Sequence, residues 1–491
     1  MNKEAYIGVD LGTSSIKVIA VNAKGSCIST VKKNLQISRG TDGKAEQNPK
    51  TWKIITGKCL RELATRLEQL SYQAAGVSVT GQMDGPVLLD KKGHSIRSVP
   101  LWCDTRCIPQ CKKIELQIER EQLLDITGHT AVTGYTAPKL MWILDNEPEV
   151  IEKSCHLIFP KDYITKLLTG IIATDYSDAS NSLLLNIQKG EWDLGIIREL
   201  NLATLEYPSI VNGSDIIGHI TKKGARWSGL PPGTPVAAGV GDSIAAALGA
   251  GIHDSSVLQI VIGTAGNVNG VLKDLVIDHS GRVHTGFYVD NKNWICTGVL
   301  QASGASLRWW SRVTGKSLDS LIMEVEGLKH QGVMFAPYLS GERTPYLDSR
   351  VRGAFTSLDI STTRGDMTRA VIEGIAFSFR DAIEVFYNIG IKPKSFFITG
   401  GGAKSNIVCQ TIANAVSLPL QRIMSDITAR GVSILAAYAA GLVADWRDIV
   451  QIWPLATDLF MANQDASYEE KYKYFKKLYP FLAKQSGLLK T

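Results

Sequence analysis

The chain opens with two short segments in which apolar side chains recur at every second position. Residues 6–10 and residues 16–20 both show this period of two, which is typical of half-buried strands. The link between them, residues 11–15, reads Leu-Gly-Thr-Ser-Ser, so the pattern predicts a β-hairpin with backbone N–H groups and hydroxyls at its tip. Asp10 ends the first strand, where a carboxylate is costly unless it is paired, hydrogen-bonded or near a metal. An edge hairpin with an exposed acid is the alternative, but the Gly-Thr-Ser tip favours a site for a nucleotide phosphate.

The pattern of an apolar strand, a Gly-Thr tip and a second strand returns halfway along the chain. Residues 257–262 and 267–271 are apolar strands joined by Gly263-Thr-Ala-Gly266, which repeats the opening hairpin. A repeated hairpin indicates a duplicated architecture. We therefore expect an α/β protein of two similar domains, residues 1–251 and 252–491, whose Gly-Thr tips face a shared cleft.

Other periodic segments fill in both halves. Apolar residues at helical spacing predict helices, and short apolar runs bounded by Gly, Pro or Asp predict buried strands. The last amphipathic stretch, residues 468–482, is expected to pack back on the body of the protein. The predicted helices are 51–70, 109–124, 137–146, 162–168, 243–249, 363–386, 406–416 and 429–441, and the further strands are 26–31, 75–80, 87–90, 236–239 and 395–399.

Composition narrows the class of protein. The chain has 491 residues, of which 44% are hydrophobic and 20% are charged, as in ordinary globular enzymes. The 53 basic and 47 acidic residues are spread along the chain, so neither nucleic-acid binding nor a membrane-surface role is expected. The beginning of the chain has no apolar leader, no stretch reaches membrane length, and the cysteines form no Cys-x-x-Cys pair. These features predict a cytoplasmic protein.

Two further segments carry candidate chemistry for phosphate transfer. Asp242 follows the strand 236–239 and a glycine, just ahead of the second Gly-Thr tip. It is either a helix N-cap or the base that accepts a proton from a hydroxyl attacking phosphorus. Gly400-Gly-Gly-Ala-Lys-Ser405 joins a strand to a helix and matches neither a P-loop nor a dinucleotide fingerprint. Three consecutive glycines exceed the needs of a plain turn and favour an adenosine pocket.

A third group of polar side chains suits a sugar. Gln82 and Asp84 flank Met83 in a loop after a buried strand, and together they offer donors and acceptors for hydroxyl groups. Trp102 and Asp104 add an aromatic face and an acid, although an Asp–Arg ion pair with Arg106 in a surface loop is the alternative. Lys17 faces either the phosphates or solvent, and the sequence does not decide between them.

These motifs, in this order, resemble the FGGY carbohydrate kinases, and within that family the xylulose kinase branch. The likeness extends over essentially the whole chain, and the Gly-x-Thr-x-Pro-Lys-Leu-x-Trp segment is a specific family signature. The motifs that carry it are Gly8-Val-Asp-Leu-Gly-Thr-Ser14, Glu46-Gln-Asn-Pro49 with Trp52, Gly81-Gln-Met83, Leu101-Trp102 with Asp104 and Arg106, Gly134-Tyr-Thr-Ala-Pro-Lys-Leu-Met-Trp-Ile143, Leu157-Ile-Phe-Pro-Lys-Asp-Tyr163, Leu168-Thr-Gly170, Asp175-Tyr-Ser-Asp-Ala-Ser180, Gly241-Asp242, Gly263-Thr-Ala-Gly266, Glu373-Gly374 and Gly400-Gly-Gly-Ala-Lys-Ser405.

The resemblance implies two actin-like, ribonuclease-H-like domains with a nucleotide cleft between them. It implies transfer of the γ-phosphoryl group of ATP, with Mg²⁺, to a hydroxyl of a small sugar, most naturally the terminal hydroxyl of a ketopentose such as D-xylulose. Homodimers are common among such enzymes. The implied roles are Asp242 as base, Asp10 as the acid that works with Mg²⁺, Thr13, Ser14, Lys17, Gly263 and Thr264 at the phosphates, Gly401, Gly402 and Asn406 at adenosine, Trp310 near the nucleotide, and Gln82, Met83, Asp84, Trp102, Asp104 and Asp242 at the sugar.

The chain departs from the xylulose kinase pattern at one position of the sugar loop. That branch usually carries Gln-Met-His-Gly, where this chain has Gln82-Met-Asp-Gly85. An acid at Asp84 still suits a polyhydroxy substrate, so another pentulose, a sugar acid or a polyol stays open as the acceptor. A nucleotide-binding regulatory protein on the same fold, without catalysis, is the alternative of another class. Ala429-Arg-Gly431 also departs from many relatives, and the sequence does not say what it changes.

Overall fold

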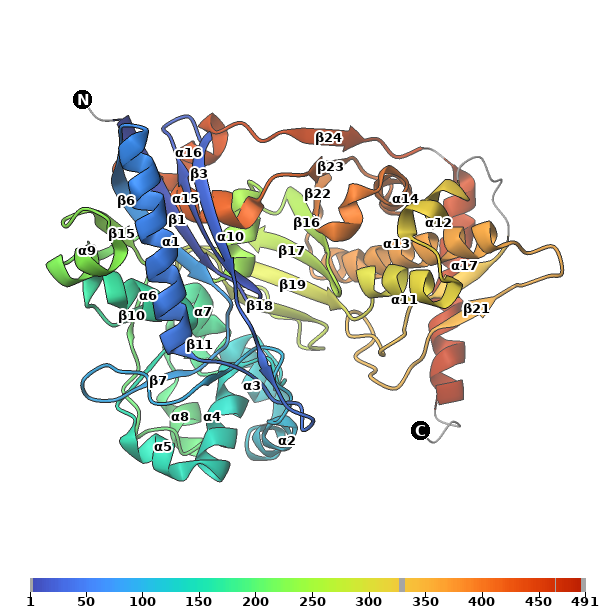
Figure 1. Ribbon diagram of the computed structural model, residues 1–491. Helices are drawn as coiled ribbons and strands as arrows, with labels where there is room; N and C mark the ends of the chain where they lie inside the picture. The colour runs from blue at the N-terminus through green and yellow to red at the C-terminus, as the bar shows by residue number, and fades with distance from the viewer. Residues whose placement is uncertain (1–2, 326–331, 464, 487–491) are drawn as a thin grey trace.

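A computed structural model describes residues 3–325, 332–463 and 465–486 of the chain. Two lobes lie side by side, each built on one large sheet with helices against it, and the chain passes from the blue lobe to the yellow and red lobe (Figure 1). The predicted α/β fold with two lobes is therefore confirmed. None of the helices in the described ranges is long and apolar enough to cross a membrane.

The first lobe holds a six-stranded sheet in the order β14-β15-β6-β1-β2-β3. β1 and β2 form the predicted antiparallel hairpin, and β6 runs parallel to β1 on its other side. The strands of this sheet are β1 (Lys3–Leu11), β2 (Ser15–Val21), β3 (Cys27–Asn34), β6 (Tyr72–Gly81), β14 (Ile216–His219) and β15 (Pro235–Ala237).

The second lobe holds a seven-stranded sheet in the order β18-β19-β17-β16-β22-β23-β24. The hairpin β16–β17 is antiparallel and β22 runs parallel to β16, so the relation of β1, β2 and β6 recurs here. The repeat inferred from the two Gly-Thr tips is thus a repeat of topology. The strands are β16 (Val257–Ile262), β17 (Gly266–Leu272), β18 (Val283–Phe287), β19 (Trp294–Leu300), β22 (Ser395–Thr399), β23 (Leu420–Ile423) and β24 (Thr457–Phe460).

Small sheets extend the lobes. The three-stranded one pairs β4 with β5 and β5 with β8, and the others are pairs. Their strands are β4 (Ser38–Arg39), β5 (Ala45–Gln47), β7 (Val87–Leu89), β8 (Val99–Pro100), β9 (His156–Ile158), β10 (Ala173–Asp175), β11 (Leu185–Asn186), β12 (Glu191–Trp192), β13 (Ser209–Val211), β20 (Met334–Ala336) and β21 (Ala354–Thr356).

The helices of the first lobe cover one face of its sheet and build an extension below it (Figure 1). α1 begins where the Asn48 side chain accepts a hydrogen bond from the Lys50 N–H at 2.9 Å, and its Trp52 and Leu60 side chains are completely buried. Each such side chain contributes about 1.5–3 kcal/mol by leaving water. These helices are α1 (Pro49–Gln69), α2 (Ile108–Gln117), α3 (Arg120–Thr127), α4 (Thr136–Asn146), α5 (Pro148–Lys153), α6 (Pro160–Thr169), α7 (Tyr176–Ser180), α8 (Leu194–Glu199), α9 (Lys222–Ser228) and α10 (Asp242–Gly249).

The helices of the second half include a closing helix, α17, which packs on α13 and α14. The Tyr472 hydroxyl donates to Asp381 at 2.7 Å, and the Lys476 ammonium pairs with Glu384 at 2.6 Å. These helices are α11 (Gly304–Thr314), α12 (Leu318–Met323), α13 (Arg364–Asn388), the 3-10 turn η1 (Gly401–Lys404), α14 (Asn406–Val416), α15 (Ile427–Ala439), α16 (Trp446–Ile452) and α17 (Ala466–Ser486).

One predicted helix is two. Residues 109–124 have helical periodicity, but the structure breaks them into α2 and α3, because Ile118 takes an extended conformation with φ −124° and ψ 121°. The apolar period continues across this break, so periodicity alone could not reveal it.

Two helices cross between the sheets and join the lobes. α15 belongs to the second half of the chain, yet it packs on β1 and β6 of the first sheet and on α10 (Figure 1). Glycines permit the close contact: a Cβ atom on Gly431 would lie 1.9 Å from the Ala245 carbonyl oxygen, and one on Gly249 would lie 1.7 Å from that of Ile427. Arg430 donates to the Gly249 carbonyl oxygen at 2.6 Å. The Ala-Arg-Gly departure in the sequence is therefore part of this crossing.

We expect Gly431→Ala to lower the free energy of unfolding by about 2 kcal/mol, because overpacking outweighs the roughly 1 kcal/mol by which alanine favours a helix. Chemical denaturation followed by circular dichroism measures the change. Gly332→Ala is the matched control, since Gly332 is exposed and no heavy atom lies within 4 Å of the added Cβ. Equal stability of the two variants would contradict the tight crossing.

Candidate functional site

Three parallel strands of the first sheet end at one edge, and each has an acid at or shortly after its end. β6 is parallel to β1 on one side and to β15 on the other, and Gly81 at the end of β6 forms a parallel bridge with Gly241. The carboxyl ends of parallel strands meet at the same edge of a sheet, which is where ligands bind in open α/β folds. Asp10, Asp84 and Asp242 are therefore brought together from distant parts of the sequence.

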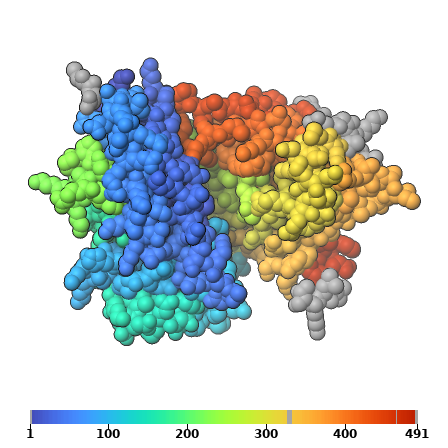
Figure 2. Space-filling view, viewed as in Figure 1, coloured from blue at the N-terminus to red at the C-terminus, as the bar shows by residue number. Residues whose placement is uncertain are grey.

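A cavity of about 480 Å³ lies at this edge and takes side chains from both lobes. In the space-filling view the surface is recessed between the blue lobe and the yellow and orange lobe (Figure 2). Five residues of the predicted site line the cavity, namely Thr13, Met83, Asp84, Trp102 and Asp242. Polar residues that the sequence analysis did not single out also line it, among them His129, Tyr135, Asn181, Asn267, His284 and Arg343.

Asp242 is the first residue of α10 and faces the cavity. Burial, and after it the nearby charge of Asp10, together raise its pKa to about 7, against the opposing effect of the Ser243 N–H. A carboxyl group that titrates near neutrality can both accept and release a proton at physiological pH. This environment suits a general base better than it suits a simple helix cap.

Asp84 shares the cavity with Asp242 and is held in an unusual conformation. Its φ is 71°, in the left-handed region that aspartate tolerates better than most residues. Thr136 and Lys139 donate to its carbonyl oxygen at 3.0 and 3.3 Å, which fixes the loop. Burial raises the pKa of its carboxyl to about 7, although Lys139 opposes the shift. Within the described residues, its Oδ1 atom is buried and accepts no hydrogen bond, so it is available to a ligand.

Asp10 lies opposite Lys17 in the first hairpin. Burial raises the pKa of Asp10 to about 6 in spite of the Lys17 charge. Lys17 itself forms an ion pair with Asp426 at the start of α15. Neither sequence hypothesis for Lys17 anticipated this pairing, because Asp426 lies in the other half of the chain. A single acid beside the phosphate tip, Asp10, fits the few-carboxylate arrangement by which Mg²⁺ is held next to phosphates.

The first Gly-Thr tip is held from behind by buried amides. Gln47 donates to the Thr13 carbonyl oxygen at 2.7 Å, and Gln82 donates to the Gln47 side-chain oxygen at 2.8 Å. The Trp102 indole donates to the Thr13 hydroxyl at 3.0 Å. Gln82 is 1% exposed and supports the tip through Gln47, so it does not line the cavity. Ser14 is exposed at the tip itself.

The second Gly-Thr tip adjoins the glycine turn. The Gly304 N–H, which begins α11, donates to the Gly263 carbonyl oxygen at 3.0 Å, and Thr264 is exposed. The glycine turn follows β22, the parallel neighbour of β16, and a Cβ on Gly402 would lie 2.3 Å from Ile262. Gly401 is exposed with open space around it, and Asn406 accepts a hydrogen bond from Arg422 at 2.7 Å. The turn and the tip thus form one continuous glycine-rich surface.

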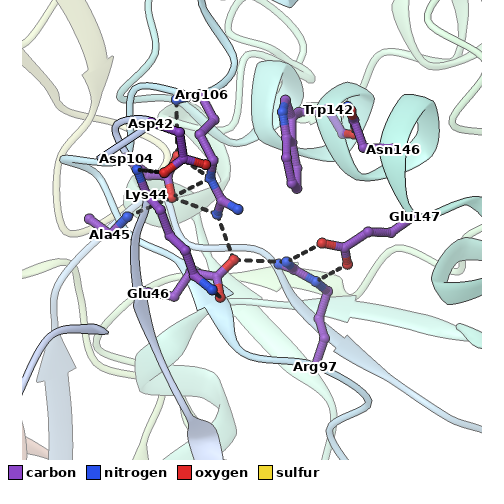
Figure 3. Close-up of polar contacts among 10 residues, drawn as sticks. All are labelled: Asp42, Lys44, Ala45, Glu46, Arg97, Asp104, Arg106, Trp142, Asn146 and Glu147. Atoms are coloured by element: carbon purple, nitrogen blue, oxygen red, sulfur yellow. Dashed lines mark hydrogen bonds and ion pairs between the residues drawn. The ribbon is translucent and has the colours of Figure 1, made fainter. Parts of the chain in front are cut away.

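Two predicted site residues lie elsewhere. Asp104 is 2% exposed and is bound by Arg106 at 2.7 Å, and the same guanidinium contacts Glu46 at 2.5 Å and lies over the Trp142 ring (Figure 3). Arg97 extends this network from Glu46 to the next helix. The ion-pair alternative for Asp104 is therefore the observed one, and its carboxylate has no access to the cavity.

Trp310 is also part of a core. Its indole donates to the Thr368 hydroxyl at 2.8 Å, and its ring packs on Trp309 and Phe355. Only 5% of the residue is exposed. It therefore supports α11 from within the second lobe, and no ring face is open to a nucleotide.

A group of histidines joins the two lobes inside the cavity. The Tyr135 hydroxyl lies 2.9 Å from His129 and 3.1 Å from His284, and Arg343 contacts the other nitrogen of His284. Burial lowers the pKa of both imidazoles, that of His129 to about 3, and Arg343 lowers them further. Both histidines are therefore neutral near pH 7. Only Tyr135 falls inside a sequence motif, so no local signal could have identified the other three.

A buried ion cluster supports the loop that carries Asp242. Lys161 pairs with Asp162 at 2.5 Å and with Asp175 at 2.9 Å, and all three side chains are at most 3% exposed. The Ser177 hydroxyl donates to Asp175 at 2.5 Å and accepts the Gly241 N–H at 3.0 Å. The cluster thus fixes the residue immediately before Asp242.

Models of known families account for most of this chain. The N-terminal domain of the FGGY family of carbohydrate kinases matches residues 5–249, and the C-terminal domain of that family matches residues 258–440. The chain belongs to the FGGY family of carbohydrate kinases. It is a sugar phosphotransferase, and the cavity described above is its candidate active site.

Individual relatives of this carbohydrate kinase are similar along nearly their full length. The xylulose kinase of Bacillus subtilis is 34% identical over 440 residues, which cover 89% of this chain and 88% of that protein. The xylulose kinase of Escherichia coli is 32% identical over 480 residues, covering 96% and 98%. The crystal structure of xylulose kinase from Rhodospirillum rubrum superposes with a TM-score of 0.91 at 26% identity, covering 98% of this chain and all of that one.

We expect Ser177→Ala to lower kcat about tenfold, because the Gly241 N–H loses its acceptor at a cost of about 1–3 kcal/mol and Asp242 shifts. Initial rates at varied sugar and ATP measure kcat and both KM values, and the KM for ATP should stay unchanged. Ser154→Ala is the control, since that hydroxyl only donates to a carbonyl oxygen within its own segment. An unchanged kcat for Ser177→Ala would contradict the positioning role.

Proposed function

We propose that this FGGY kinase transfers the γ-phosphoryl group of ATP to the terminal hydroxyl of a ketopentose, D-xylulose, and that Asp242 is the general base. One observation carries the proposal. The Asp242 carboxyl, with a pKa near neutrality, faces the same cavity as Asp84, and the cavity reaches the first Gly-Thr tip at Thr13 and the second at Ala265.

The chemistry follows from this placement. The sugar hydroxyl gives its proton to the Asp242 carboxylate as its oxygen bonds to the γ-phosphorus, and the bond from that phosphorus to the β,γ-bridging oxygen breaks, which releases ADP. Most of the catalysis in such a transfer is positioning and charge neutralisation. Asp84 Oδ1 and His129 Nε2, which are buried and have no hydrogen-bond partner among the described residues, offer hydrogen-bond partners that orient the sugar hydroxyls.

The phosphates are assigned to the tips. We place them between Thr13 and Ser14 of the proposed domain 1–251 and Gly263 and Thr264 of the proposed domain 252–491, with adenosine on the surface of Gly401, Gly402 and Asn406. Asp10 would hold Mg²⁺, which when bound supplies positive charge to the phosphate oxygens. Lys17 would be kept near the phosphates by its ion pair with Asp426.

The relatives favour the ketopentose. Those at 30% identity or more, covering most of this chain, include xylulose kinases from several bacteria. Asp84 fits this substrate because its free Oδ1 atom can accept hydrogen bonds from two neighbouring hydroxyls.

We expect D-xylulose to stimulate ADP release from ATP and Mg²⁺ more than D-ribulose, D-gluconate, erythritol or glycerol. A coupled assay for ADP measures each rate against a reaction without sugar.

Asp242→Asn, of nearly equal size, should lower kcat at least a thousandfold while ATP binding persists, because no base remains. Failure of every acceptor to exceed the sugar-free rate would refute the kinase, and full activity of Asp242→Asn would exclude Asp242 as base.

The pH profile tests the same residue independently. Asp242 must be deprotonated to accept a proton, and burial raises its pKa to about 7. The value of kcat/KM for the sugar should therefore rise as the pH increases through about 7 and level off above it. Rates at low sugar concentration between about pH 5 and 9 give this profile. An acid limb near pH 4, the ordinary range of aspartate, would show that Asp242 is not the titrating base.

A further inference from the structure

A second cavity lies on the outer side of the first lobe, away from the sugar cavity. It has a volume of about 670 Å³ and is enclosed by α1, α6, α9 and the turn after β7. It shares no lining residue with the sugar cavity. Nothing in the proposed reaction uses it.

Cations dominate this second cavity, and no carboxylate lines it. The basic residues of its lining are Lys50, Lys53, Lys92, Lys166, Lys223 and Arg226. An adjoining cavity of about 340 Å³ shares Lys92, Lys166 and Lys223 and also lacks acids. The positive charge is therefore concentrated in a concave surface and faces inward from four separate segments.

These cations are not engaged elsewhere. Across the residues that the structure describes, Lys53, Lys223 and Arg226 form no ion pair and donate no side-chain hydrogen bond. The neighbouring carboxylate, Asp90, accepts the backbone N–H groups of Lys92 and His94 at 2.8 Å, so it is used within its own turn. Six cations around one hollow outnumber this single neighbouring carboxylate, so they repel one another, and an anion between them reduces that repulsion.

Lys166 is the partly buried member of the group, and its side chain is held by a hydrogen bond. Its ammonium donates to the Gly93 carbonyl oxygen at 2.8 Å, and a Cβ on Gly93 would lie 2.5 Å from that nitrogen. Partial burial and the charges of Lys223 and Lys53 lower the pKa of Lys166, and the charge of Asp90 partly opposes them. The Trp227 indole donates to the Lys53 carbonyl oxygen at 3.1 Å, which fixes α9 against α1. The cavity is therefore preformed.

We infer that this cavity is a binding site for a small molecule with two or more phosphate groups. Lysine ammonium groups act as point charges that suit phosphate oxygens from several directions, whereas a planar carboxylate is best held by the paired nitrogens of arginine. Several cations around one hollow match an anion of more than one group. A concave site with cations on several sides, unlike a flat basic stripe, favours a small molecule over a nucleic acid.

The test uses the full-length protein and inorganic triphosphate as the probe, without Mg²⁺. Isothermal titration calorimetry compares the wild type with Lys53→Glu/Lys223→Glu. The matched control is Lys58→Glu/Lys222→Glu, which makes the same change of net charge on the same two helices at exposed positions outside the cavity lining. We expect at least a tenfold weaker affinity in the first variant and less than a twofold change in the control.

Kinase activity is measured on all three proteins, so that folding and the proposed function are judged separately from binding. Absence of triphosphate binding to the wild type, or equal weakening in both variants, would overturn the inference. Tighter binding of a single-stranded oligonucleotide than of triphosphate, with the same dependence on Lys53 and Lys223, would replace the small molecule by a nucleic acid. If triphosphate also occupies the Gly-Thr tips, the first variant loses one of two binding events and keeps the other.

Discussion

The parallel pairing of β1, β6 and β15 is the constraint on which the site depends. Because the three strands run in one direction, the acids at or just after their ends meet at one edge. Burial raises the pKa of Asp10 to about 6 and those of Asp84 and Asp242 to about 7. It does so in spite of Lys17 beside Asp10 and Lys139 beside Asp84, so further positive charge brought to this edge would stabilise the carboxylates.

The surroundings keep this edge in place by separate means on each side. Behind Asp242, Lys161 forms buried ion pairs with Asp162 and Asp175. Asp175 accepts a hydrogen bond from the Ser177 hydroxyl, which in turn accepts the N–H of Gly241. Behind the first tip, neutral amides provide the support: Gln82 donates to Gln47, and Gln47 donates to the backbone of the tip at Thr13. Removing one partner of a buried pair leaves an uncompensated group, so these supports are as exacting as the residues that face the cavity.

Much of this arrangement could be predicted from the sequence because its signals are local. A hairpin, a Gly-Thr tip and an acid at a strand end are all contained within about ten residues, and the repeat of that pattern gave the two-lobed fold. Partners across the fold left no such signal. For Asp104 the sequence offered both the sugar role and the ion pair with Arg106, and it could not show which of the two the burial of the carboxylate favours. For Trp310 it could not show which ring face is covered. His284 and Arg343 reach the cavity only through the second sheet and its loops.

The crossing of α15 onto the first sheet also has a consequence for how the protein is made. Gly8 and Gly76 lie against this helix, since added Cβ atoms would lie 2.6 Å from Val432 and 2.2 Å from the Ala436 carbonyl oxygen. One face of the first sheet is therefore covered by residues that leave the ribosome after almost nine-tenths of the chain. Until then the nascent first lobe exposes an apolar face, so the first lobe to be synthesised cannot be the first to be completed, and the two lobes must mature together.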